Sequence, residues 1–196
     1  MTVRDRDARA SVEYLRQAIG WMDSAPATVL ENVWYRMDQA EVVASIARPL
    51  RKLKRFEEAR RYLDRALSTF QALLLKQPSN KMVLAMMTAA LLELGALESE
   101  LGHGPAAENA VREALATNIE RVVQANPSNL LLTWRLAQCY EALGGLAERR
   151  PNRAVARQWY ARSLALWKQW KQAGRPSSGF LETRLRAATA AYERIQ

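Results

Sequence analysis

One helical pattern recurs four times along this chain at nearly constant spacing, and this recurrence limits the folds open to it. Each copy places mostly apolar or small side chains at positions i, i+3, i+4, i+7, i+8 and i+11, which form one face of an α-helix. The copies open at Ser11, Ala59, Ala107 and Ala156, so they lie 48, 48 and 49 residues apart. The spacing predicts an internal repeat of one supersecondary unit.

A second helix fits within each period. The pairs Ile46-Ala47, Leu94-Gly95 and Leu143-Gly144 each precede the opening alanine of the next copy by the same interval. A small residue at this place lets two helices approach closely. Each period is therefore predicted to hold two helices of about 22 residues, or about 33 Å. Such pairs bury both faces only by stacking on their neighbours.

Helix stop and start signals follow the same spacing. The segments 77–80 (Gln-Pro-Ser-Asn) and 126–129 (Asn-Pro-Ser-Asn) lie 49 residues apart. Each is predicted to end one helix and cap the next, because Pro stops a helix and the Ser or Asn oxygen accepts from free N–H groups. Pro105 suits the first turn of a helix, and Pro151 the equivalent turn one repeat later. The segment 174–178 should break the pattern before a last, single-faced helix.

These residues resemble the tetratricopeptide repeat. Tyr140, Leu143-Gly144, Ala156, Tyr160 and Ser163 carry the family's spacing of large, large-small, Ala, aromatic and small residues. The unit here is longer than the family's usual length of about 34 residues. The resemblance implies an all-α fold, a right-handed α-solenoid of antiparallel helix pairs in one domain over 1–196. The first expected part is a helix (1–26) that matches the second helix of a repeat but has no first helix as its partner. Three repeats (27–78, 79–127 and 128–175) and a C-terminal cap helix (176–196) follow.

The longer repeat also resembles the C-terminal repeat region of large bacterial serine/threonine protein kinases. The segments 136–144 and 156–167 carry this likeness, which covers most of residues 40–195. The chain has no Gly-rich phosphate loop, no His-Arg-Asp and no Asp-Phe-Gly. The resemblance therefore implies a non-catalytic protein–protein interaction scaffold or adaptor, the regulatory or docking region linked to such a kinase.

Enzyme chemistry finds little support in the composition. One His and one Cys cannot supply the three or four ligands of a zinc site. His103 lies in a predicted Gly-His-Gly-Pro turn, where an exposed or capping role is expected. Glu93, Glu98 and Glu100 are expected to form a solvated helix face. We therefore predict no catalytic residue, no metal and no cofactor.

No membrane or export segment is expected. The first residues carry charges without the apolar region of a signal peptide. The longest apolar run, 82–92, contains Thr88 and is shorter than the ~20 residues of a span, so it is predicted to be a buried helix face. A lone Cys139 fits a reducing compartment. The expected location is the cytoplasm, or outside it if a parent chain is anchored in a membrane.

Charge is uneven along the chain, whose net charge is +9. Residues 48–65 hold eight basic and three acidic residues, residues 144–176 hold eight and one, and residues 81–143 hold four and seven. In the resembled family the first helix of each repeat lines the groove that binds partners. Carried over by position, the groove residues are Arg48, Arg51, Lys52, Trp134, Gln138, Glu141 and Arg149.

The partner expected for this groove is a protein or peptide with acidic or phosphorylated groups, because guanidinium groups pair with both. Alternatively, Arg48, Arg51 and Lys52 form only a solvated helix face. We call the helix face formed by the recurring pattern the repeat stripe. Trp34 and Trp170 lie outside this stripe, so each is either an exposed anchor or part of a cap interface.

Two other functions stay open. The basic zones could bind nucleic acid, although neither a helix-turn-helix unit nor interleaved aromatic and basic residues favour it. The first helix is predicted to present Tyr14, Leu15, Ile19 and Met22 on one apolar face. Either residues 31–53 cover this face, or an upstream segment does, or a second copy does through Tyr14 and Leu15.

Overall fold

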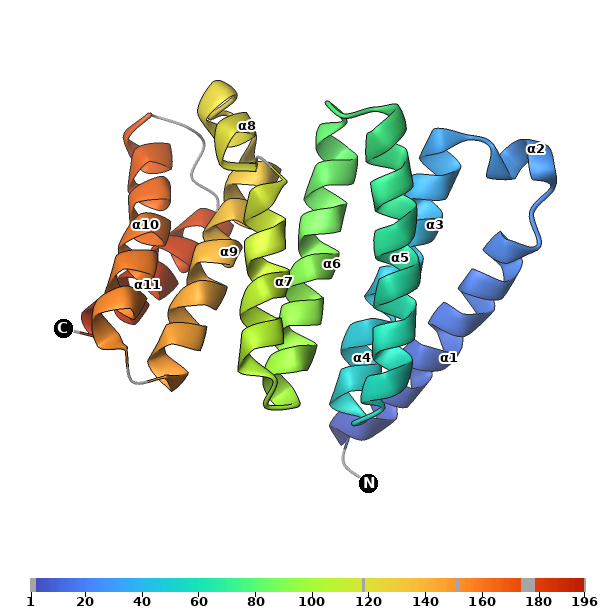
Figure 1. Cartoon of the computed structure of the whole chain (residues 1–196), viewed down its shortest axis with the longest axis horizontal. Helices are drawn as coiled ribbons and strands as arrows, with labels where there is room; N and C mark the ends of the chain where they lie inside the picture. The colour runs from blue at the N-terminus through green and yellow to red at the C-terminus, as the bar shows by residue number, and fades with distance from the viewer. Residues whose placement is uncertain (1–2, 118, 151, 174–178, 196) are drawn as a thin grey trace. The chain divides into compact units, whose positions relative to one another are not determined.

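The computed structural model describes residues 3–117, 119–150, 152–173 and 179–195. All regular structure in these ranges is helical (Figure 1). The chain forms two compact units, Met1–Leu101 and Gly102–Gln196, which we call unit 1 and unit 2. Their boundary falls inside the predicted second repeat, between its two helices. The turn predicted at Pro151 and the break predicted at 174–178 lie outside the described residues.

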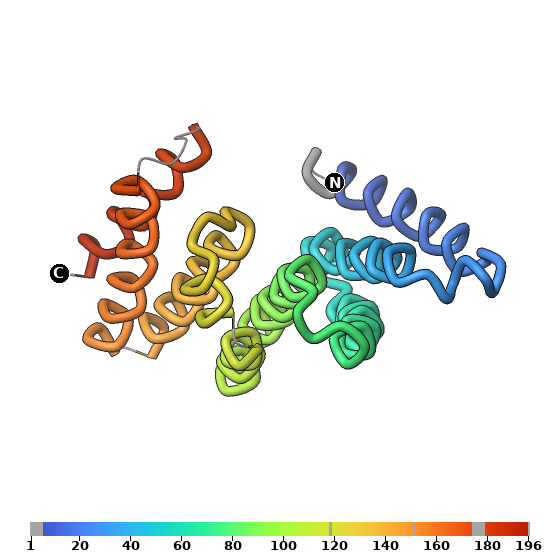
Figure 2. Tube along the Cα trace, turned by 90° about the horizontal axis from the view of Figure 1, so that it is seen from above, coloured from blue at the N-terminus to red at the C-terminus, as the bar shows by residue number. Residues whose placement is uncertain are grey.

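Unit 1 is built around one long helix. Its elements are α1 (Val3–Asp23), α2 (Ala27–Leu30), α3 (Val33–Ser45), α4 (Ala47–Lys52), α5 (Phe56–Lys76) and α6 (Lys81–Glu100). Helix α5 packs against α3, α4 and α6, while α1 packs against α3 and α4. Figure 2 shows α1 beside α3. Leu50, Leu63, Phe70 and Leu91 are fully buried between these helices.

The first predicted helix of repeat 1 is broken in two. Helix α3 ends at Ser45, and α4 begins at Ala47. The cause is Pro49, which has no N–H to donate to the carbonyl of Ser45 four residues earlier. The regular bonds resume one residue later, where the Leu50 N–H donates to the Ile46 carbonyl at 3.1 Å. The prediction of one long continuous helix was therefore wrong here.

Unit 2 is also helical throughout its described regular structure. Its elements are α7 (Gly104–Ala116), α8 (Ile119–Ala125), α9 (Leu130–Arg149), α10 (Arg153–Gln172) and α11 (Gly179–Glu193). Helix α9 packs against α7, α8 and α10, and α11 packs against α10. Helix α7 ends at Ala116, where the Thr117 hydroxyl donates to the Ala114 carbonyl at 2.6 Å.

Asparagine caps mark the helix starts at the repeat spacing. The predicted caps are confirmed, since Asn80 accepts from the N–H groups of Met82 and Val83, and Asn129 accepts from Leu132. Asn32 caps α3 in the same way, one repeat before Asn80. Pro105 lies in the first turn of α7, as predicted.

Most described positions of the repeat stripe are buried in its last three copies. Ala59 and Leu63 on α5, Ala107 on α7, and Ala156 and Tyr160 on α10 are all at most 5% exposed. The close approach predicted at Gly144 is also present. A Cβ atom there would lie 2.7 Å from Cε1 of Tyr160, so only glycine fits against this ring.

The first copy of the stripe behaves differently. The buried side chains of α1 are Ala8, Val12 and Ile19, which face α3 and α4. Tyr14 is 73% exposed. Of the predicted apolar face, Ile19 is buried and Leu15 and Met22 are half-buried, so α3 and α4 cover this face only in part.

Helix α6 is the most apolar element. By length and composition alone it could cross a membrane, but 56% of its most apolar stretch is buried within the structure. Core helices of other folds meet the same criterion, so the indication is weak. Val83, Met87 and Leu91 of this helix are buried, as predicted for the apolar run.

Candidate functional site

The predicted basic residues of α4 are paired with acids of α6. The Arg51 Nε–H donates to the Glu93 carboxylate at 2.8 Å, and its Nη1 donates to Glu100. Arg48 lies 3.5 Å from Glu93 and is far more exposed. Burial lowers the pKa of Arg51, but the two carboxylates outweigh it and raise the pKa overall. The charge of Arg51 is thus compensated within unit 1.

The three glutamates of α6 do not form the solvated face that we expected. Glu98 is 2% exposed and pairs with Arg60, while the side chain of Glu93 is 14% exposed. These carboxylates are stabilised by arginines from α4 and α5, which sequence spacing within one helix could not indicate. Lys52, in contrast, is exposed and has no ion pair within the described residues.

The predicted groove residues of α9 are held by contacts within unit 2. Trp134 is half-buried and meets Phe180 of α11 edge-on, with ring centroids 5.3 Å apart. The Arg184 guanidinium lies over both rings. Gln138 accepts from Arg135 Nη1 at 2.9 Å. These side chains contribute to the packing of α9 with α11.

Glu141 lies between α9 and α10. The Ser163 hydroxyl donates to its carboxylate at 2.9 Å. Burial raises the pKa of Glu141, and the Ser163 hydrogen bond and the charge of Arg184 oppose this only in part. Arg149 is exposed at the end of α9. The seven predicted groove residues are therefore divided between the two units, three in unit 1 and four in unit 2.

The two tryptophans outside the repeat stripe differ in burial. Trp170 is buried with Trp167, Leu181 and Ala188 at the junction of α10 and α11. Trp34, in the first turn of α3, is 62% exposed. On α1, Tyr14 and Trp21 are each 73% exposed, and their spacing of seven residues places them on one side of the helix. Unit 1 thus displays three large aromatic side chains.

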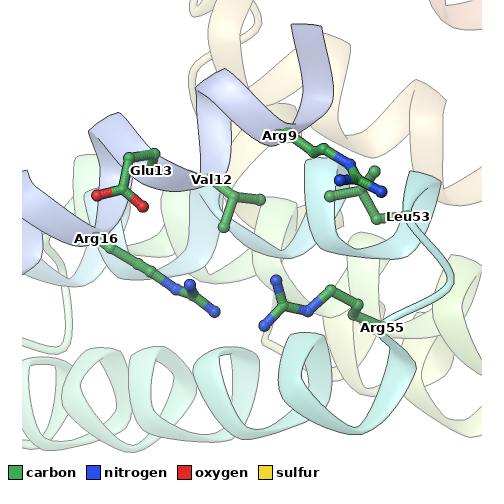
Figure 3. Close-up of a pocket in the computed structure, with 6 residues that line it drawn as sticks. All are labelled: Arg9, Val12, Glu13, Arg16, Leu53 and Arg55. Carbon is green, nitrogen blue, oxygen red and sulfur yellow. The ribbon is translucent and has the colours of Figure 1, made fainter. Parts of the chain in front are cut away.

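A pocket of about 400 Å³ lies between α1 and the turn that joins α4 to α5. Figure 3 shows the guanidinium groups of Arg16 and Arg55 pointing toward one another across it, with Arg9 extending above Leu53. Val12 forms part of the wall. The carboxylate of Glu13 points away from the space between Arg16 and Arg55. We call this the arginine pocket.

Glu58 joins two of these arginines. Its Oε1 accepts from Arg16 Nη2, and its Oε2 pairs with Arg55 Nη2. Burial alone would raise the pKa of Glu58, but the bond from Arg16 and the charge of Arg55 lower it overall. Glu58 therefore stays ionised and fixes both guanidinium groups. Arg9 is exposed and has no ion pair in the described part of the chain.

Our sequence reasoning missed this pocket. Arg9 and Arg16 are seven residues apart, which places them two helical turns apart on one face, and this spacing was a usable signal. The contribution of Arg55 was not visible, because it depends on how α1 packs beside the start of α5. Chemically, the pocket offers positive charge and N–H donors to an oxyanion.

Other reactive groups give no further site. Within the described ranges, no three His, Cys, Asp or Glu side chains lie close enough together to hold a metal ion. Burial raises the pKa of Cys139 to about 12, so its thiol is protonated at neutral pH.

A comparison with protein-family models gave no match, and a comparison with curated proteins gave none.

Proposed function

We propose that this chain is a non-catalytic protein–protein interaction scaffold whose helices form a tetratricopeptide-like solenoid of antiparallel pairs. The observation that carries this proposal is the arginine pocket, which leaves Arg9 unpaired within the described residues and open to an acidic group from a partner. The regular helix starts support the solenoid. Helices α3, α6, α9 and α11 begin at Val33, Lys81, Leu130 and Gly179, which repeats the spacing of the sequence pattern.

The partner class follows from the surface of unit 1. Trp, Tyr and Arg are the residues that most often contribute strongly to protein interfaces. Exposed examples of all three lie on α1 and α3, at Tyr14, Trp21, Trp34 and Arg9. An acidic protein segment suits this surface. Following the resemblance of residues 40–195, we extend the proposal to a docking role beside a bacterial serine/threonine kinase, with the cytoplasm as the expected location.

The test is a nuclease-treated pull-down from source lysate followed by binding measurements on the purified partner. The baits are the native chain and the variant Arg48→Glu/Lys52→Glu, whose changed side chains are exposed. A nuclease-resistant partner that binds the native chain with measurable affinity supports a scaffold, and weaker binding by the variant places the contact on α4. If no protein survives nuclease treatment, the scaffold proposal is wrong.

Salt dependence separates this function from polyanion binding. Six phosphate contacts would weaken affinity by about 10³-fold or more between 50 and 200 mM salt. A protein partner held by mixed aromatic and polar contacts should lose much less.

Self-association is a second candidate, favoured by the exposed side of α1. The change Tyr14→Lys/Trp21→Lys alters two side chains that are each 73% exposed, so the fold should tolerate it. Leu15, which we first paired with Tyr14, is half-buried and less suitable. Sedimentation that gives a native dimer and a variant monomer would support this function, and a native monomer would exclude it.

A further inference from the structure

Building on the proposed scaffold function, we propose that the arginine pocket binds the phosphate group of a phosphorylated serine or threonine in the protein partner. Arg9, Arg16 and Arg55, from two separate segments, line one space of about 400 Å³, and the guanidinium groups of Arg16 and Arg55 point toward one another across it (Figure 3). This volume lies at the lower end of the range for small-ligand sites, about 300–1,000 Å³. The pocket therefore accommodates one modified side chain and not an extended strand of nucleic acid.

The donors are fixed before a ligand arrives. Glu58 accepts from one Nη2 of Arg16 and one of Arg55. A guanidinium has five N–H donors in a rigid plane, so both groups keep donors for another acceptor. The side chain of Glu58 is 15% exposed, and it holds the two arginines in place. Binding therefore costs little side-chain entropy at these two residues.

The charge balance favours phosphate over carboxylate. Glu58 already supplies one carboxylate to Arg16 and Arg55, Glu13 also lines the pocket with its carboxylate turned away from these two, and Arg9 has no ion pair among the described residues. A carboxylate offers one charge and two oxygens. A phosphorylated side chain carries about −1.5 to −2 charges at neutral pH and three strong acceptor oxygens. The additional charge and the third oxygen give the arginines that line the pocket more to bind than a carboxylate offers.

The wall of the pocket suits the rest of such a side chain. Val12 is 3% exposed and closes the wall from within, so the apolar surface beside the charged groups comes mainly from half-buried Leu53. The methylene of phosphoserine or the methyl of phosphothreonine can lie against Leu53 while the phosphate meets the arginines. This combination distinguishes a modified side chain from free inorganic phosphate, which gains nothing from the apolar wall.

The experiment uses the full chain and an immobilised degenerate peptide library with a central phosphoserine or phosphothreonine. Matched libraries carry unmodified serine or threonine, or glutamate, at the same place. Free O-phosphoserine and inorganic phosphate serve as soluble competitors. We expect retention of the phosphorylated library alone, followed by calorimetry on the best individual peptide.

The variants are Arg9→Gln and the matched control Arg61→Gln. Arg61 is exposed on α5 outside the pocket and has no ion pair within the described residues, so its loss removes the same charge. A hydrogen bond between charged partners contributes more than one between neutral groups. We therefore expect Arg9→Gln to weaken the phosphopeptide about tenfold or more, and Arg61→Gln to change it less than twofold. Circular dichroism should give the same melting temperature for both.

Three results would overturn the proposal: equal loss of affinity in the two variants, equal retention of the unmodified library, or no retention of any library. Each can be told apart from failure of the scaffold function. The protein partner from the pull-down makes this distinction. If it binds the native chain and Arg9→Gln equally, the scaffold function stands and only the phosphate site is excluded.

Discussion

Arg51 lies between Glu93 and Glu100, and its side chain is only 18% exposed. The change Arg51→Glu would place three carboxylates together and leave Glu93 and Glu100 with only their longer pairings, to Arg48 and Lys54. We expect it to lower the free energy of unfolding by about 2 kcal/mol or more. Arg48→Glu is the control, because Arg48 is 69% exposed and its pairing is longer, so a change of about 0.5 kcal/mol is expected. Urea titration measures both, and equal effects would contradict this account of Arg51.

Glu141 gives a pH-dependent prediction. Because burial raises its pKa in the folded state, stability contributed by the protonated form is lost as pH rises from the ordinary value of 4.5 through the raised one. Glu141→Gln keeps an acceptor for Ser163 and has no charge to bury. We expect the variant to be more stable than the native chain at pH 7, with the advantage vanishing below about pH 4. Thermal melting across this range tests it, and a less stable variant at pH 7 would show that the charged carboxylate is required.

At the scale of elements, replacing each of two adjacent glycines of α9 by alanine should change the stability in opposite directions. A Cβ at Gly144 would lie 2.7 Å from the Tyr160 ring, whereas one at Gly145 would lie 3.7 Å from the Tyr160 hydroxyl. Gly144→Ala should therefore cost about 1–3 kcal/mol through overpacking. Gly145→Ala should stabilise α9 by up to about 1 kcal/mol through helix propensity. Denaturant midpoints measure both, and similar effects would mean that α10 shifts easily to admit a methyl group.

Local signals in the sequence specify where most helices begin, and long-range packing decides how they face each other. The caps Asn80 and Asn129 were predictable because capping needs only residues two or three positions away. The break before α4 was equally local, since Pro49 removes one donor, but the repeat pattern hid it. The pairing of Arg51 with α6 and the meeting of Arg55 with α1 depend on residues far away along the chain. No periodicity within one helix indicates them.

At the scale of the whole molecule, the division into two units predicts separate responses to destabilisation. Each unit buries its own set of apolar side chains, such as Phe70 in unit 1 and Trp167 in unit 2. A loss of about 2 kcal/mol in unit 1 should speed amide exchange there by about 30-fold. Hydrogen exchange of Arg51→Glu, read peptide by peptide, should show this increase within residues 1–101 only. An equal increase in residues 102–196 would mean that the two units open together.

Cys139 has a practical consequence for any work on this protein. It is the only cysteine in the chain, it is fully buried, and its pKa of about 12 keeps it from reacting as a thiolate. A maleimide dye should therefore not react with the native chain, but it should label a cysteine introduced at an exposed position. Fluorophores or spin labels can be placed on α1 or α4 without first removing the natural thiol, and the core of unit 2 stays intact while binding is followed in real time.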